Sequence, residues 1–343
     1  MNTELVSLAS FDVDKASNIT PTIPEYVIHS ICQIGCGTLI QGEPGCGKTA
    51  LTIALAAAVS SGHSILDMPA LIPGPVVIVS NEDNPGTIRT MLEANGADLD
   101  MCYIVKAPAG LELGSAHFEA LLAQYRPTLV IFDPLQSYLG ARINMDKANE
   151  TRPVLGATLE MAQKYQCALI FIAHTGKTKS DKNMVYQSLG SVDIPGAMRD
   201  VFHVRPCKDR PGQTEMVHAK SNSGPLQPPL IYQVGAKRKV NFLGYDGEPK
   251  TLPEDDYLYV TIDALINKYD CEFYSYEELQ DASLMVTGTS VTSIDLMRRK
   301  LAGGIGVLFR RNGIIIETDV ERNGRMGVRI TYAEYLTRGA HLL

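Results

Sequence analysis

Long uninterrupted hydrophobic stretches are missing from this chain of 343 residues. The longest apolar runs, such as ALIFIA at 168–173, are far shorter than the roughly 20 residues that a membrane-spanning helix needs. We therefore expect no membrane partner. The first residues also lack a basic stretch followed by an apolar one, so we expect no secretory signal and a cytoplasmic protein.

Cysteine is scarce and irregularly spaced. The seven cysteines form an odd, scattered set, and although Cys32 and Cys36 lie close together, no second pair with metal-ligand spacing follows. The pattern argues against a zinc site and favours reduced thiols. Internal repeats and low-complexity tracts are absent too. With 45% hydrophobic and 20% charged residues, the composition is that of an ordinary globular protein.

An excess of positive charge is also lacking, since the formal net charge is −7. Overall charge does not indicate nucleic-acid binding, but the distribution is uneven. Between Arg298 and Arg329, eight Lys or Arg residues stand against three acids, a local charge of +5. A local basic surface can bind a polyanion even when the whole protein is acidic.

What the chain does contain is a glycine-rich stretch, TLIQGEPGCGKTALTIALAAAV, at 38–59. Its Gly42-x4-Gly47-Lys48-Thr49 spacing fits the phosphate-binding loop G-x-x-x-x-G-K-[ST]. An apolar strand is expected before the loop and an alanine-rich helix ending at Gly62 after it, which is the context that this motif needs. The loop predicts a site for ATP, with Lys48 on the phosphates and Thr49 on Mg²⁺. The residues expected to surround the phosphates are Gly42, Glu43, Pro44, Gly45, Cys46, Gly47, Lys48, Thr49 and Ala50.

From about residue 37 to 234, short β-rich runs alternate with stretches of helical periodicity. Runs such as LVIF and ALIFIA are apolar on both faces, as expected for parallel strands covered by helices. The pattern predicts an α/β fold with a mostly parallel sheet. We assign 25–234 to this ATPase domain, with 1–24 as an N-terminal arm and an antiparallel extension toward the end.

After this domain the pattern changes. Residues 235–256 are polar and rich in Gly and Pro and are predicted to form a linker. In 257–343, three helix candidates are followed by two β runs joined by Asn-Gly, a strong hairpin signal. This order suits a winged helix-turn-helix that binds DNA. A small helical cap on the ATPase domain is the alternative, because such folds also serve as protein-interaction modules.

Acidic side chains follow two of the predicted strands. Asp133 ends LVIFD, at the strand edge where open parallel sheets bind ligands, and is predicted to hold Mg²⁺. Glu82 follows VVIVSN and is predicted to polarise the water that attacks the γ-phosphate, with Asp83 as a supporting residue or second candidate. A solvated turn is the alternative for the acidic pair.

A third strand, ALIFIAH, ends at His174, which we predict to contact the γ-phosphate. The loop after it carries Lys177, Lys179 and Lys182. These lysines either lie in a solvated loop or contribute to an electrostatic groove for a nucleic-acid strand. Arg298, Arg299 and Arg325 are the DNA-binding candidates of the C-terminal region.

The series GEPGCGKT, SNED, VIFDP, IAHTGK, GAMRDV and AKSNSGP resembles the RecA-like hexameric ATPases of the plasmid replicative helicase RepA type, over roughly 20–234. The resemblance implies ATP sites between the subunits of a ring that moves along single-stranded DNA. Glu82 then matches the catalytic glutamate and His174 the γ-phosphate sensor. Arg199 matches the arginine finger given to the neighbouring subunit, and Lys220 a second cation acting on that site.

We therefore expect a Mg²⁺–ATP-driven motor, a replicative DNA helicase of a mobile element acting as a hexamer, with a primase or initiator protein as a possible partner. A different class of function is an ATP-switched DNA-binding loader or regulator that does not unwind. A recombinase-like filament is the third interpretation.

Overall fold

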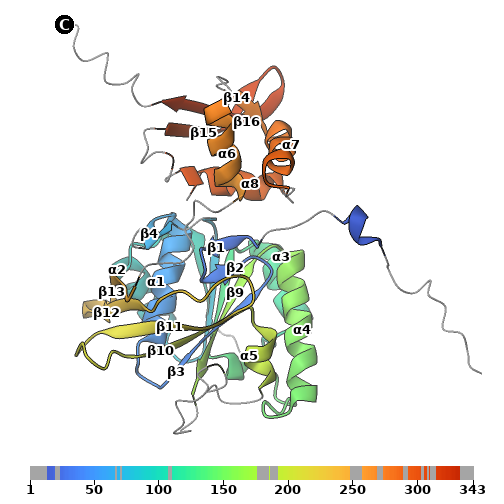
Figure 1. Cartoon of the computed structure of the whole chain (residues 1–343). Coiled ribbons are helices and arrows are strands. Elements are labelled where there is room, and N and C mark those ends of the chain that lie inside the picture. The colour runs from blue at the N-terminus through green and yellow to red at the C-terminus, as the bar shows by residue number, and fades with distance from the viewer. Residues whose placement is uncertain are drawn as a thin grey trace, which may run out of the picture.

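In the computed structural model, the described residues are 14–19, 24–65, 68–69, 72–106, 110–175, 185, 192–247, 257–268, 273–288, 293–302, 305–306, 309 and 314–332. They form an α/β domain and, above it in Figure 1, a smaller group of C-terminal helices and strands. No helix in these ranges is both long enough and apolar enough to cross a membrane.

The centre of the α/β domain is a nine-stranded sheet in the order β13-β12-β11-β10-β3-β9-β8-β6-β7. Six neighbouring strands run parallel, and their bounds are β10 Asp200–Pro206, β3 Gly37–Gly42, β9 Ala168–His174, β8 Leu129–Asp133, β6 Val76–Ser80 and β7 Cys102–Val105. The remaining strands form an antiparallel edge, namely β11 Thr214–Ser221, β12 Leu230–Val234 and β13 Val240–Tyr245. The predicted α/β class with a mostly parallel sheet is confirmed.

Helices cover both faces of this sheet (Figure 1). Those of the domain are α1 Lys48–Ser61, α2 Pro85–Ala94, α3 Ala116–Tyr125, α4 Ala148–Lys164 and α5 Asp193–Ala197, with short 3-10 turns η3 Leu99–Met101, η4 Leu135–Tyr138 and η6 Ala236–Arg238. A further 3-10 turn, η2 Ala16–Asn18, precedes the domain in the chain. Short hairpins pair β1 Tyr26–Ile28 with β2 Cys32–Gln33, and β4 Ser64–Ile65 with β5 Met68–Pro69.

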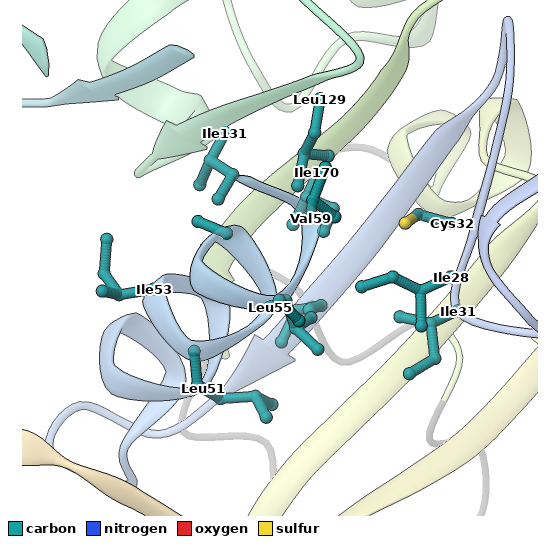
Figure 2. Packing of buried hydrophobic residues seen from close by; sticks show 14 of the residues in the cluster. Ile28, Ile31, Cys32, Leu51, Ile53, Leu55, Val59, Leu129, Ile131 and Ile170 are labelled. Carbon is teal, nitrogen blue, oxygen red and sulfur yellow. The ribbon is translucent and has the colours of Figure 1, made fainter. Parts of the chain in front are cut away.

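Helix α1 is buried along most of its length, which explains its alanine-rich, mainly apolar sequence. Leu51, Leu55 and Val59 pack toward residues of β1, β8 and β9, as Figure 2 shows. Gly62 caps the helix in a left-handed conformation with φ 71°, where we predicted the helix to end. Rigid packing of this helix fixes the phosphate loop that precedes it.

Our predicted linker differs from the structure in its first half. Residues 240–245 form β13, which pairs antiparallel with β12 and extends the sheet beyond residue 234. The sequence VNFLGY contains a partial signal for this strand, because Val240 and Phe242 stand on either side of the polar Asn241. The Gly- and Pro-rich composition of the surrounding residues favoured a linker over a strand. Residues 248–256 of the predicted linker, and most of the predicted 1–24 arm, lie outside the described ranges.

The C-terminal region contains α6 Tyr257–Lys268, β14 Phe273–Ser275, α7 Tyr276–Thr287, α8 Ile294–Ala302, β15 Ile314–Arg322 and β16 Arg325–Tyr332. The three strands form one sheet in the order β14-β16-β15. Asn323 and Gly324 make the predicted hairpin turn, both with positive φ (55° and 75°). The order of three helices and a hairpin matches the prediction; a winged helix that binds DNA remains a prediction.

The two parts of the chain share a core. Ile72, on the segment that enters β6, is fully buried within the C-terminal cluster that includes Leu258, Met297 and Phe309. Tyr26 and Ile34 of the α/β domain pack against the same cluster. The C-terminal region is therefore docked on the α/β domain through apolar side chains, which also fits the cap alternative.

We expect Ile72→Ala to lower the free energy of unfolding by about 2–5 kcal/mol, because it removes a buried side chain and leaves a cavity in the shared core. Denaturant titration of the full chain measures this. Ile294→Ala is the matched control, since Ile294 is 39% exposed, and its effect should stay within about 0.5 kcal/mol. Equal stability of the two variants would contradict the shared core.

Candidate functional site

The glycine-rich loop lies between the end of β3 at Gly42 and the start of α1 at Lys48. Gly47 caps the helix with φ 90° and supplies no side-chain acceptor, so the first amides of α1 are left for another partner. A Cβ on Gly42 would lie 2.3 Å from the carbonyl oxygen of Val204, so close packing with β10 requires glycine there. A helix start whose first amides have no side-chain acceptor, directly after a glycine loop, suits a phosphate group.

Lys48 is 5% exposed and lies under the loop. Its Nζ donates to the carbonyl oxygens of Gly42 at 2.9 Å and Glu43 at 2.8 Å. Both acceptors are neutral carbonyl groups, so neither contact pairs the ammonium with a carboxylate. A triphosphate placed against the loop amides would meet this charge.

Thr49 and Asp133 meet across the tips of α1 and β8. The Thr49 hydroxyl donates to Oδ2 of Asp133 at 2.7 Å, whereas Oδ1 of Asp133 is buried without a hydrogen-bond partner. The pKa of Asp133 is raised to about 6, because the effect of burial outweighs the opposite effect of the hydrogen bond from Thr49. The Thr49 hydroxyl and the free Oδ1 of Asp133 are hard oxygen ligands of the kind that Mg²⁺ prefers. A bound Mg²⁺ would in turn favour the charged form of the Asp133 carboxylate.

Glu82 and His174 are brought together from two different strands. Oε1 of Glu82 lies 2.8 Å from Nε2 of His174 at the tip of β9. The turn that carries Glu82 is fixed by Ser80, whose Oγ accepts the amides of Glu82 at 3.2 Å and Asp83 at 3.3 Å. A carboxylate and an imidazole in contact can hold a water molecule and take its proton.

These groups line one cavity of about 600 Å³ at the carboxyl ends of the parallel strands. Its lining also includes residues that sequence reasoning missed, which come from the end of β10, the antiparallel edge strands and the turn before β13: Pro206, Gly212, Gln213, Thr214, Val234 and Arg238. Their only sequence signal was the β pattern of the edge strands. The predicted loop residues Gly45 to Ala50 line the cavity with Glu82, Asp83, Asp133 and His174.

Arg199 lies elsewhere. It immediately precedes β10, and its amide donates to the carbonyl oxygen of Gly37 at the start of β3, 3.0 Å away. The strands β3 and β10 run parallel, and the cavity lies at their carboxyl ends. Arg199 therefore lies at the opposite side of the sheet, where these strands begin. Arg199 is exposed and its guanidinium reaches the thiol of Cys36, whose pKa burial raises. It is therefore remote from the cavity of its own chain.

Lys220, which is predicted to act on a neighbouring subunit, is held by backbone carbonyl groups of its own chain. Its Nζ donates to the carbonyl oxygens of Pro195 at 2.9 Å and Met198 at 2.7 Å, with Gly196 at 3.4 Å. Burial lowers the pKa of this ammonium. Three carbonyl groups occupy its three donors, so in this structure Lys220 supports the backbone that leads into Arg199 rather than pointing outward.

Of the cations predicted to bind DNA, the three that the structure describes have partners within the chain. Arg299 donates from Nη1 to the Thr128 hydroxyl at 2.6 Å and so points into the α/β domain, while its role in DNA binding remains a prediction. Arg298 binds Asp319 with Nη2–Oδ2 at 2.8 Å. Arg325 lies 3.7 Å from Glu278 and is 64% exposed. Lys177, Lys179 and Lys182 lie outside the described residues.

Comparisons with known proteins give a family match and a similar solved structure. A family model described as an AAA domain (AAA_25) matches residues 2–180, more than half of the chain. That range includes the glycine loop and the acidic strand tips. Among solved structures, one described as "Crystal structure of the RadB recombinase" aligns over 60% of this chain and 90% of its own, with 16% identity and a TM-score of 0.41.

Proposed function

Because the chain belongs to the AAA domain family and has the phosphate loop of a P-loop ATPase, we propose that it hydrolyses Mg²⁺–ATP to move along single-stranded DNA. The specific role is a cytoplasmic replicative DNA helicase of a mobile element that acts as a hexamer of the RepA type. The observation that carries the proposal is the convergence of Lys48, Thr49, Asp133, Glu82 and His174 on one cavity.

Each side chain has a distinct task in this proposal. The amides at the start of α1 and the ammonium of Lys48 bind the β and γ phosphates. Thr49 and Asp133 hold the metal, and Mg²⁺ when bound neutralises charge on the phosphate oxygens. Glu82 accepts a proton from the attacking water, and His174 orients Glu82 and senses the γ-phosphate through their 2.8 Å contact.

Arg199 completes the site of a neighbouring subunit. It is exposed, it lies at the sheet edge away from its own cavity, and its backbone is held on both sides. The amide of Arg199 donates to Gly37, and its carbonyl oxygen accepts from the amide of Asn222 at 3.0 Å. A cation presented from a rigid strand end suits a finger that stabilises transition-state charge across an interface.

A loader or regulator that holds DNA mainly through the C-terminal cations is the less favoured function. Arg298 and Arg299 of α8 already bind Asp319 and Thr128, and Lys300 is fully buried. Using these residues on DNA would break contacts that hold the region together. The exposed Arg325 at the hairpin remains available to a nucleic acid or to a partner such as a primase or initiator protein.

The test is the ATPase rate of the full chain with Mg²⁺, alone and with single-stranded DNA, duplex DNA or RNA. We expect turnover that rises when single-stranded DNA is added, together with ATP- and DNA-dependent assembly seen by mass measurement. A Lys48→Ala preparation controls for contaminating ATPases. Absence of Mg²⁺–ATP binding by the wild type would overturn the proposal.

A further inference from the structure

The turn between β12 and β13, residues 235–239, reaches the nucleotide cavity from the segment that composition marked as a linker. Lys237 and Arg238 both adopt the left-handed backbone region, with φ of 53° and 55°. Two successive non-glycine residues in that region are costly and persist only where the surroundings fix them.

Asn95, at the end of α2, supplies part of that support. Its Oδ1 accepts the amide of Val240 at 2.9 Å, and its Nδ2 donates to the carbonyl oxygen of Met91 at 2.8 Å, with that of Arg238 at 3.4 Å. The turn closes on itself through the amide of Gly235, which donates to the carbonyl oxygen of Lys239 at 2.7 Å. The backbone of Arg238 is thus tied to the carboxyl end of α2.

From this anchor the side chain of Arg238 runs back along α2 toward its start. Nη1 passes Met91, 4.0 Å from its sulfur, and donates to Oδ2 of Asp83 at 2.9 Å. The Asp83 side chain is only 19% exposed, although that of Arg238 is 52% exposed. An arginine held at its backbone and along its stem loses less freedom in forming an ion pair than a free surface side chain does.

Asp83 shares its turn with Glu82, since both amides bind Oγ of Ser80. Movement of Asp83 therefore shifts the backbone of the residue whose carboxylate contacts His174. We propose that Arg238 is a positioning residue in cis: by fixing Asp83 to the β12–β13 turn, it holds the Glu82 carboxylate in place for hydrolysis. This inference rests on the proposed ATPase function.

A double-mutant cycle in the full chain tests it, with Arg238→Met, Asp83→Asn and the double variant. We expect kcat of Arg238→Met to fall about 10- to 100-fold with little change in KM, because misplacement by about 1 Å costs up to about 10²-fold. The double variant should lose no more than the worse single variant, since Arg238 acts through Asp83. Arg238→Lys should recover part of the rate.

Lys237→Met is the matched control, because Lys237 is the adjacent cation of the same turn with nearly the same backbone conformation. Its kcat should equal that of the wild type. Melting temperature and Mg²⁺–ATP binding of Arg238→Met should remain near wild-type values, which separates positioning from misfolding.

Three results would overturn the inference: unchanged kcat in Arg238→Met, losses that add in the double variant, or a rise in KM alone, which would mean that Arg238 binds the nucleotide directly. A loss of kcat accompanied by a large loss of thermal stability would also count against it, because it would make the role structural. A wild type without ATPase activity is a different outcome, since it would refute the proposed function itself.

Discussion

Glu82→Gln is expected to bind Mg²⁺–ATP as well as the wild type does and to hydrolyse it about 10²–10⁴-fold more slowly, the usual contribution of a general base. The amide keeps the size of the carboxylate and can still contact His174, now 2.8 Å from Glu82. It cannot accept the proton of the attacking water. Binding and chemistry should therefore separate in this variant.

Single-turnover hydrolysis and equilibrium nucleotide binding measure the two effects. Glu93→Gln is the control, since Glu93 lies on α2, is not among the residues that line the cavity, and forms an exposed ion pair with Arg89 at 3.0 Å. Full turnover in Glu82→Gln would remove Glu82 from the role of base and leave Asp83 as the next candidate. If Glu82→Gln lost both nucleotide binding and turnover, the turn that carries Glu82 would support the phosphate loop rather than the chemistry.

Arg199→Ala is expected to lower ATP turnover by about 10³–10⁵-fold, the range for removal of an arginine finger. The physical reason is that the guanidinium stabilises charge that develops only in the transition state. Nucleotide affinity should change little. Since Arg199 lies at the sheet edge opposite its own cavity, the loss should be felt in the neighbouring subunit.

Mixing experiments test that direction. An assembly of Arg199→Ala and Lys48→Ala subunits should regain part of the activity, because each Lys48→Ala subunit presents its Arg199 to an intact loop on a neighbour. Arg152→Ala is the control, as Arg152 is an exposed arginine of α4 with a loose 3.7 Å contact to Asp193. Full activity of Arg199→Ala, or no recovery on mixing, would contradict a finger acting between subunits.

Most residues of the cavity that we predict to carry the chemistry could be identified from the sequence. Glu82, Asp133 and His174 could be placed because each ends an apolar run, and parallel strands that end together bring their tips together. Lys48 and Thr49 followed from the spacing of the glycine loop. Their direct contacts, such as Thr49 with Asp133 and Glu82 with His174, required the register of β6, β8 and β9.

Cations were harder to interpret, because a lysine or arginine has a long side chain and its sequence position says little about its partner. Lys220 was expected to act on another subunit but binds three carbonyl groups beside Arg199. Arg299 was expected on DNA but bonds to Thr128 at the start of β8. Arg238 lies in a polar stretch that carries no recognisable motif, yet it binds Asp83 in the cavity.

By itself, the sequence determined the α/β class, the phosphate loop and the acidic strand tips, because these depend on local spacing and on the period of apolar residues. Tertiary structure alone decided which charges meet. Residues 155 positions apart, Asp83 and Arg238, form an ion pair only because β13 adds to the sheet edge and turns its loop over α2. Such contacts depend on the path of the whole chain, which no local pattern encodes.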